Sequence, residues 1–148
     1  MSLNAILAAK GRNIICVEPT ADLATASKLL SKHRIGALVV LDAGGRLVGI
    51  LSERDIVRMM SDRGSSALRL RVAQVMTRKV STCDVNDSIS SVMDRMTKGK
   101  FRHMPVLDNG RIAGLVSIGD VLKLHIETLG EQVHQLEASI AELQLMKL

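Results

Sequence analysis

The sequence predicts an α+β fold in which a strand-helix-strand-strand-helix unit occurs twice and a long helix follows. Three observations predict it. A block of the chain is repeated, because residues 36–57 (GALVVLDAGGRLVGILSERDIV) are matched by residues 102–122 (RHMPVLDNGRIAGLVSIGDVL). Each copy follows a segment with the apolar spacing of a helix and contains two strand-like runs joined by a glycine turn. A heptad-like apolar pattern then continues from Leu122 to Leu143.

The first helix of each unit is predicted by apolar residues three and four positions apart. They are Leu23, Ala26, Leu29 and Leu30 in the first unit and Ile89, Val92, Met93 and Met96 in the second. A β-hairpin is predicted after each helix, because a turn rich in Gly, Asn and Asp separates two apolar runs. The runs are Ala37–Leu41 and Leu47–Leu51 in the first unit, and Met104–Leu107 and Ile112–Val116 in the second. Between the units, residues 61–66 predict a polar loop and residues 70–76 the start of a short helix.

The composition is that of an ordinary globular protein, with 47% hydrophobic and 24% charged residues among 148. No apolar run approaches the roughly 18 residues that a membrane span needs, and the N-terminal segment lacks the features of a signal peptide. Cys16 and Cys83 lie at roughly corresponding points of the two units, and without secretory features we do not expect a disulfide between them. We expect a cytoplasmic protein that does not contact a membrane.

The net charge of +5 raises the question of nucleic-acid binding. Phe101 is the only aromatic residue, so the chain lacks the stacking platforms of proteins that bind single strands or RNA. The basic residues are mostly scattered, and no helix-turn-helix pattern is present. We therefore expect no nucleic-acid partner, although a positive field would also favour a small ligand that carries phosphate.

Each unit ends in a Ser-x-x-Asp motif where its last strand meets the following helix: Ser52 with Asp55, and Ser117 with Asp120. One interpretation is a capping box, in which the serine caps the helix and the acid bonds back to the cap residue. The other is a ligand site, because a helix N-terminus attracts phosphate oxygens and a carboxylate can accept hydrogen bonds from both hydroxyls of a ribose. The two interpretations do not exclude each other.

The repeated motifs resemble a tandem of cystathionine β-synthase (CBS) domains, known as a Bateman module. The resemblance covers about residues 10–128 and rests on two motifs in register, with matching helices and hairpins. The matching segments are Gly49–Asp55, Val75–Thr77, His103–Asp108 and Gly114–Asp120. The chain is similar to the small stand-alone members, which have no catalytic or DNA-binding domain attached. The resemblance implies that the two repeats pack about a pseudo-two-fold axis.

On this basis we expect three parts in the chain. Residues 1–72 would form the first repeat with its N-terminal segment, residues 73–128 the second repeat, and residues 120–147 an amphipathic helix that continues from it. The resemblance also implies nucleotide sites in clefts between the repeats. In the family, the aspartate of the motif binds ribose hydroxyls, and the serine or threonine lies near the ribose or the phosphate.

The two predicted sites differ, because Arg102-His103 in the second copy stands where the first copy has Gly36-Ala37. In similar modules, basic residues at this place in one repeat reach the phosphate of a nucleotide held by the other repeat's aspartate. The Asp55 site is accordingly predicted to contain Ser52, Arg54, Asp55, Thr77, Val80, Arg102 and His103. The Asp120 site is predicted to contain Lys10, Ile15, Gly36, Ala37, Ser117 and Asp120, with Lys10 as its nearest cation. The predicted nucleotide-binding set is completed by Leu38, Met104 and Pro105.

Three of these assignments have plain structural alternatives. Arg54 and Arg102 could be solvated surface arginines, and His103 could lie at the edge of the core. Arg54 lies in the first turn of its predicted helix, where a cation opposes the helix dipole. A phosphate contact would relieve that conflict, but a surface position is equally compatible with the sequence.

The sequence contains no recognisable catalytic constellation. It lacks a P-loop and a dinucleotide-binding glycine fingerprint, and it lacks a nucleophile elbow and a Cys/His nucleophile signature. His33, His125 and His134 are isolated, and no zinc-ligand spacing is present. We expect neither an enzyme nor a metal requirement.

The C-terminal apolar pattern fits a heptad repeat. Its a positions are Ile126, Val133 and Ile140, and its d positions are Leu122, Leu129, Leu136 and Leu143. Branched residues at a with leucine at d favour a parallel two-stranded coiled coil. Gly130 interrupts the run, and the alternative is a helix packed on the protein's own core. Because a long exposed apolar stripe is unusual in a monomer, we expect a homodimer, which the resemblance also implies.

The leading functional hypothesis is a non-enzymatic regulatory sensor that binds an adenosine-containing nucleotide between its repeats. AMP is the favoured ligand, with ADP, ATP, NAD and S-adenosylmethionine as alternatives. The sequence does not identify the protein that would be regulated. The competing hypothesis is a structural or interaction protein with degenerate clefts that acts through its coiled-coil-like tail.

Overall fold

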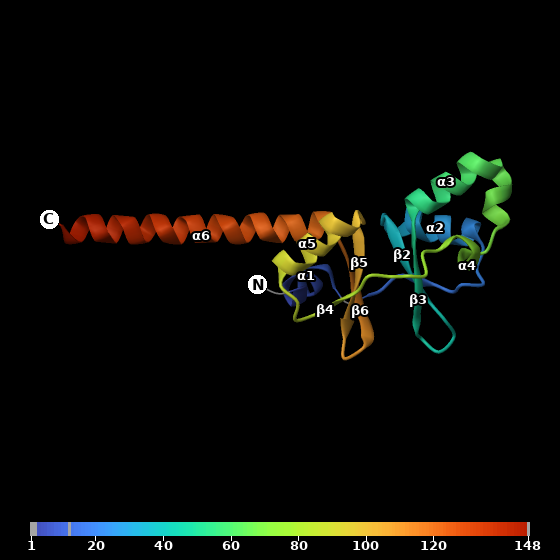
Figure 1. The fold of residues 1–148 in the computed structure, drawn as a ribbon, viewed down its shortest axis with the longest axis horizontal. Helices are drawn as coiled ribbons and strands as arrows, with labels where there is room; N and C mark the ends of the chain where they lie inside the picture. The colour runs from blue at the N-terminus through green and yellow to red at the C-terminus, as the bar shows by residue number, and fades with distance from the viewer. Residues whose placement is uncertain (1–2, 12, 148) are drawn as a thin grey trace.

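The computed structural model describes residues 3–11 and 13–147 of the chain. It contains two three-stranded sheets with helices packed beside them, and a C-terminal helix that projects from this body as a long straight rod (Figure 1). The predicted α+β fold of two similar units with a long C-terminal helix is therefore confirmed.

The first unit consists of β1 (Cys16–Val17), α2 (Leu23–His33), β2 (Ala37–Leu41), β3 (Leu47–Ser52) and α3 (Glu53–Arg63). Strand β1 pairs with β2 in parallel, and β2 pairs with β3 as an antiparallel hairpin. A parallel pair needs a crossover connection, which α2 supplies. The carboxylate of Asp22 accepts the amide of Thr25 at 2.8 Å and so caps the N-terminus of this helix.

The second unit repeats this order. It consists of β4 (Cys83–Asp84), α5 (Ile89–Gly99), β5 (His103–Asp108), β6 (Arg111–Ser117) and α6 (Ile118–Met146). Strand β4 pairs with β5 in parallel, and β5 with β6 antiparallel. Both hairpin turns contain a glycine at positive φ, Gly45 at 78° and Gly110 at 77°, a backbone conformation that a side chain disfavours. The tail helix predicted over residues 120–147 belongs to α6, which starts two residues earlier and ends at Met146.

The connection between the units is more helical than the sequence suggests. The stretch at residues 61–66 was expected to be a polar loop, but α3 continues to Arg63 and a 3-10 helix, η1 (Gly64–Arg69), follows it. Gly64 adopts a φ of 64°, which turns the chain, and Ala67 is completely buried, so this segment packs against the body. The short helix α4 (Val72–Val75) then leads into the second unit.

The helices that precede each repeat pack on the core of the other repeat. Leu3 and Leu7 of α1 (Leu3–Lys10) belong to the apolar core formed by β4, α5, β5 and β6. Val72 and Met76, at the second repeat's entrance, belong to the core of the first unit. Helix α1, assigned from the sequence to the first repeat, therefore packs in the core of the second repeat.

A glycine in the last strand of each hairpin makes this exchange possible. A Cβ atom on Gly49 would lie 2.5 Å from Sδ of Met76 and 3.0 Å from the carbonyl oxygen of Thr77. A Cβ atom on Gly114 would collide with the side chain of Leu7. Each glycine thus leaves space for a residue from the helix that leads into the other repeat, or from its flank, and the two contacts are related by the internal repeat.

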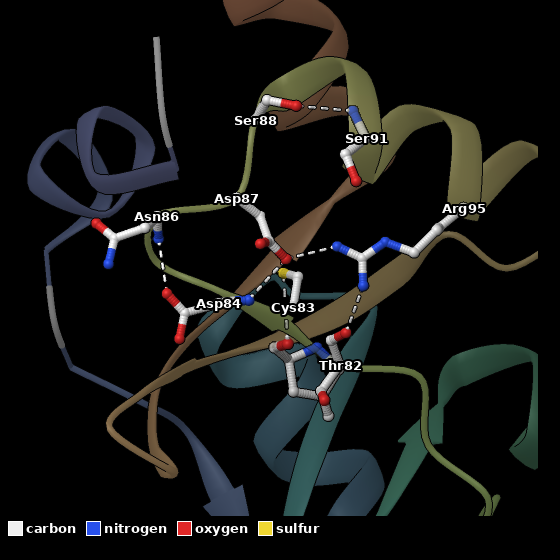
Figure 2. Close-up of polar contacts among 9 residues, drawn as sticks. Thr82, Cys83, Asp84, Asn86, Asp87, Ser88, Ser91 and Arg95 are labelled. Atoms are coloured by element: carbon white, nitrogen blue, oxygen red, sulfur yellow. Dashed lines mark hydrogen bonds and ion pairs between the residues drawn. The ribbon is translucent and has the colours of Figure 1, made fainter.

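A polar network ties β4 to α5 in the second unit (Figure 2). The guanidinium of Arg95 donates to the carbonyl oxygen of Thr82 at 2.8 Å and to the carboxylate of Asp87 at 2.6 Å. The same carboxylate accepts the amide of Asp84 at 3.0 Å. The amide of Asp84 and the side chain of Arg95 together hold the pKa of Asp87 below its usual value.

The two cysteines are free but differ in their surroundings. Cys83 is buried, and its Sγ lies 3.6 Å from the carbonyl oxygen of Pro105. Burial raises the pKa of the Cys83 thiol to about 12, so it remains protonated at neutral pH. Cys16 is exposed rather than buried.

Candidate functional site

Both Ser-x-x-Asp motifs form capping boxes at the first turn of a long helix. At the start of α3, the amide of Asp55 donates to the Ser52 hydroxyl at 3.2 Å, and the amide of Ser52 donates to the Asp55 carboxylate at 2.9 Å. At the start of α6, the same two bonds join Asp120 and Ser117 at 3.1 and 2.9 Å. The capping interpretation is therefore correct. The capping box holds each carboxylate at a defined place on the rim of a cavity.

The larger of the two cavities beside these motifs, called here the Asp55 cavity, has a volume of about 560 Å³. It is lined from the first unit by Gly36, Ala37, Ile50, Ser52, Glu53, Arg54, Asp55 and Arg58. The remaining lining residues are Thr77, Lys79, Val80, Ser81, Lys100, Phe101, Arg102, His103, Ser117 and Ile118. Since both repeats contribute, the cavity lies between them. A volume of this size is within the range of small-molecule sites.

The lining of the Asp55 cavity carries a surplus of positive charge. Its carboxylates are those of Glu53 and Asp55. Its fixed cations are Arg54, Arg58, Lys79, Lys100 and Arg102. The capping bond uses Oδ2 of Asp55, and no ion pair with Asp55 occurs among the residues that the structure describes. The cavity therefore offers a carboxylate oxygen for hydroxyl donors and several cations for an anionic group such as phosphate.

The second cavity, called here the Asp120 cavity, has a volume of about 460 Å³. It is lined by Leu7, Lys10, Gly11, Asn13, Ile14, Ile15, Arg34, Ile35, Gly36, Ala37, His103, Gly114, Leu115, Ser117 and Asp120. Residue 12, within the segment expected to line it, lies outside the described residues. Among the described lining residues, Lys10 and Arg34 are the fixed cations, so this cavity has fewer than the Asp55 cavity.

Lys10 forms an ion pair with Asp120, the carboxylate of the Asp120 cavity. Its ammonium nitrogen lies 2.6 Å from Oδ2 of Asp120 and donates to the carbonyl oxygen of Leu115 at 3.3 Å. Burial alone would raise the pKa of Asp120, but the hydrogen bonds from Lys10 and Ser117 outweigh it and hold that pKa below its usual value. The carboxylate is therefore ionised and already paired at neutral pH.

His103 lies between the two cavities and lines both. A Cβ atom on Gly36 would lie 3.2 Å from both Cε1 and Nε2 of its imidazole, so Gly36 leaves the space that the ring fills. Burial lowers the pKa of His103, while the nearby Glu53 carboxylate partly opposes that effect. The ring is therefore mainly neutral at pH 7 in the unliganded protein.

The structure brings most of the predicted site residues together. The Asp55 cavity contains all seven residues predicted for it: Ser52, Arg54, Asp55, Thr77, Val80, Arg102 and His103. The Asp120 cavity contains all six predicted for it: Lys10, Ile15, Gly36, Ala37, Ser117 and Asp120. Gly36, Ala37 and Ser117 line both cavities. Whether these residues bind a nucleotide remains a prediction.

Three predicted residues line neither cavity. Leu38 and Met104 are completely buried in the cores, and Pro105 is buried beside Met104. Successive side chains of a strand point to opposite faces, so Met104 points into the core when His103 lines the cavity.

Sequence reasoning also missed several cationic lining residues. Arg58 lies one helical turn after Arg54 and lines the same cavity, a spacing that could have been recognised in the sequence. Lys79, Lys100 and Arg34 come from loops and helix ends and carry no comparable signal.

Residues 3–11 and 13–147 contain no group of three or more His, Cys, Asp or Glu side chains arranged to hold a metal ion. Within the same part of the chain, no helix combines the length and the apolar character needed to cross a bilayer.

Comparison with protein families identifies the repeat. The family model of the CBS domain matches residues 10–62 and again residues 72–127. A 17.7 kDa protein of Acidianus ambivalens is 32% identical over 131 residues, which are 85% of this chain and 78% of that protein. The mitochondrial CBS domain-containing protein CBSX3 of Arabidopsis thaliana is 34% identical over 119 residues, and the match spans 58% of that protein's length.

Solved structures with this fold include proteins with bound adenosine compounds. The CBS-domain protein ATU1752 of Agrobacterium tumefaciens is 41% identical with a TM-score of 0.81, covering 84% of this chain and 99% of that one. The CBS domain pair of MJ0100, in complex with 5′-methylthioadenosine and S-adenosyl-L-methionine, is 26% identical with a TM-score of 0.77, covering 86% and 98%. PAE2072 of Pyrobaculum aerophilum, complexed with AMP, is 25% identical with a TM-score of 0.73, covering 81% and 89%.

Proposed function

The chain belongs to the CBS domain family as a tandem pair, and from that premise we propose that it is a non-enzymatic regulatory module that binds an adenosine-containing nucleotide between its repeats. The observation that carries the proposal is the Asp55 cavity. It combines a helix N-terminal carboxylate, which has no ion pair among the described residues, with five described lysine and arginine side chains around about 560 Å³. This arrangement suits a ligand with vicinal hydroxyls at one end and phosphate at the other.

AMP is the ligand we favour. The complexes of PAE2072 with AMP and of MJ0100 with two adenosine compounds support an adenosine ligand for this chain. The cations of the Asp55 cavity favour a ligand with phosphate over an uncharged nucleoside. ADP, ATP, NAD and S-adenosylmethionine are the alternatives to be compared directly.

Binding between two repeats would act as a signal only if the ligand has different affinities for two arrangements of the module. We propose that the regulated target is another protein, and that the module works in the cytoplasm as a homodimer without binding nucleic acid or membrane. The exposed apolar stripe of α6 supports the homodimer.

The competing proposal, an interaction protein with degenerate clefts, is favoured by one observation. Asp120 is already paired with Lys10, so a ribose would have to compete with an ammonium group for that carboxylate. The Asp55 cavity has no such pair among the described residues. The competing proposal therefore applies to the Asp120 cavity more than to the Asp55 cavity.

The deciding experiment is thermal unfolding and calorimetric titration with AMP, ADP, ATP, NAD and S-adenosylmethionine. A ligand at 100 times its dissociation constant stabilises the native state by about 2.7 kcal/mol, which corresponds to about 5–10 °C for a domain of this size. The Asp55→Asn variant keeps an acceptor for the capping bond but loses the charge, and it should bind more weakly. If none of the five compounds binds the wild-type protein, the proposed function is wrong.

A further inference from the structure

Helix α6 carries a continuous apolar stripe that the body of the protein does not cover. The seven stripe residues are between 40% and 65% exposed: Leu122, Ile126, Leu129, Val133, Leu136, Ile140 and Leu143. The body packs against another face of the first turns of this helix, where Val121 is completely buried and Leu124 contacts the second core. The stripe is therefore open along its whole length, including the part next to the body.

We infer that the stripe is covered by α6 of a second copy of this chain, with the two helices antiparallel and centred near Gly130. This arrangement specifies the contact surface of the proposed homodimer and does not depend on nucleotide binding. It differs from the parallel pairing that the heptad positions alone favour. The core layers of the stripe are compatible with the antiparallel direction, and two features of the chain support it: its flanking charges and the overall division of charge between body and tail.

The core layers match in the antiparallel direction. Antiparallel coiled coils pair a positions with d positions, so Ile126 faces the partner's Leu136, and Val133 faces the partner's Leu129. Ile140 likewise faces the partner's Leu122. Every layer then combines one branched residue with one leucine, and no apolar residue of the stripe from Leu122 to Ile140 is left without a partner. The apolar core thus permits both directions, and the charges decide between them.

The flanking positions favour the antiparallel direction. With these layers, Lys123 lies beside the partner's Glu137, and symmetry makes this opposite-charge pair occur twice. Gly130 lies beside the partner's Gly130, and it has open space around it for the close approach of another backbone. In the parallel direction, Glu137 would instead lie beside the partner's Gln132, and no opposite-charge pair would form across the seam.

The distribution of charge along the chain supports the same direction. Residues 118–148 carry five acidic and two basic side chains, whereas residues 1–117 carry 18 basic and 10 acidic ones. Antiparallel helices place each acidic tail beside the partner's basic body, where Arg102 lies at the start of α6 with its carbonyl oxygen 2.8 Å from the amide of Ile118. Parallel helices would place the two basic bodies together, which is repulsive.

The direction can be tested by zero-length carbodiimide cross-linking of the full chain, followed by mass spectrometry. Lys123 and Glu137 are 14 residues apart, about 21 Å along one helix, so a covalent link between them can form only between two chains, and only if the helices are antiparallel. Lys98 and Asp94, which lie 3.0 Å apart within one chain, provide an internal positive control. We expect both links in a dimer isolated by size exclusion.

Charge exchange provides a second, quantitative test by sedimentation equilibrium. Lys123→Glu and Glu137→Lys should each raise the dimer dissociation constant about tenfold, because two attractive pairs become repulsive, and the double exchange should restore it. Glu131→Lys makes the same charge change on the outer face of the helix and should have little effect. A monomeric wild-type protein, or a dimer with no Lys123–Glu137 link and no rescue, would overturn the inference. Nucleotide titration is a separate measurement, so a failure of the proposed function would not be mistaken for a failure of this one.

Discussion

The ammonium group of Lys10 lies 2.6 Å from the carboxylate of Asp120, whereas Asp55, at the equivalent place in the first repeat, forms no ion pair within the described part of the chain. This difference depends on α1, whose residues pack on the second repeat and bring Lys10 to its cavity. The two repeats therefore have the same capping geometry but present their carboxylates differently to a ligand.

Replacing Lys10 by Met should lower stability at neutral pH by about 0.5–1 kcal/mol, a modest loss because Lys10 is 43% exposed and solvent screens the pair. The folded state lowers the pKa of Asp120, so the pair contributes stability above the unfolded pKa of about 3.9. That contribution is lost as the pH falls through the folded pKa. Urea unfolding should show a larger difference between variant and wild type at pH 7 than at pH 3.

Lys98→Met is the matched control for this experiment. It also breaks a lysine–aspartate pair, with Asp94, but both side chains are more than half exposed. Its effect on stability should be close to zero at either pH. A loss in the control as large as that in Lys10→Met would show that the Asp120 pair is no stronger than an ordinary surface pair.

Arg102→Ala should weaken nucleotide binding at the Asp55 cavity by about 10- to 100-fold, the range expected for a charge-assisted contact with phosphate. Binding at the Asp120 cavity should be nearly unchanged, because Arg102 is not among its lining residues. Arg46→Ala removes an arginine that lines neither cavity and serves as the control. Calorimetry that shows equal affinities for the Arg102 and Arg46 variants would contradict the phosphate assignment.

The affinity for AMP should rise as the pH is lowered from 8 toward 6, because a bound phosphate favours the protonated form of His103. Burial lowers the pKa of this histidine in the unliganded protein, so the rise should continue below pH 6.5. It should flatten near pH 6, where the phosphate itself takes up a proton. Titrations in buffers of different ionisation enthalpy would detect the accompanying proton uptake, which His103→Gln should abolish.

The same histidine should affect the stability of the unliganded protein in a defined direction. Because its folded pKa is lowered, the unfolded chain binds more protons between the folded value and about 6.5. Stability should therefore fall as the pH drops through this interval, and His103→Gln should reduce that fall.

For the AMP titrations, an affinity that does not change between pH 8 and pH 6 would show that His103 does not contact the phosphate.

The local features of this fold follow from the sequence because their causes are local. Capping residues such as Asp22 and Ser52, the hairpin glycines and the spacing of apolar residues act within a few positions of the chain. The internal repeat adds a strong constraint, because two copies of one pattern must form two similar units. These signals are sufficient to predict the α+β fold and the place of both Ser-x-x-Asp motifs.

Other features depend on contacts between distant segments and have no local signal. The exchange of α1 and α4 between the two cores is one example, and the approach of Lys10 to Asp120 across 110 positions is another. The cations Lys79 and Lys100 reach the Asp55 cavity only because the two repeats pack against each other.

The last prediction concerns the contact between the first hairpin and the segment that precedes the second repeat. In Gly49→Ala, the new methyl group would meet Met76 and the carbonyl oxygen of Thr77 at 3.0 Å. Thr77 cannot easily move away, because its amide and carbonyl bond to Ile50 at 2.9 and 3.0 Å. We expect a loss of about 1–3 kcal/mol in urea unfolding, together with weaker nucleotide binding, because Thr77 lines the Asp55 cavity.

Gly114→Ala is the matched variant in the second repeat, and comparison of the two isolates the role of the backbone contact. The three atoms nearest to its methyl group would all belong to the Leu7 side chain, which is more able to shift than paired backbone. The loss should therefore be smaller, below about 1 kcal/mol, and nucleotide binding at the Asp55 cavity should be retained. If both variants lose the same stability, the prediction is wrong. The hydrogen bonds between Ile50 and Thr77 would then not hold the segment around Thr77 in place, because that segment would accommodate the methyl group as readily as Leu7 does.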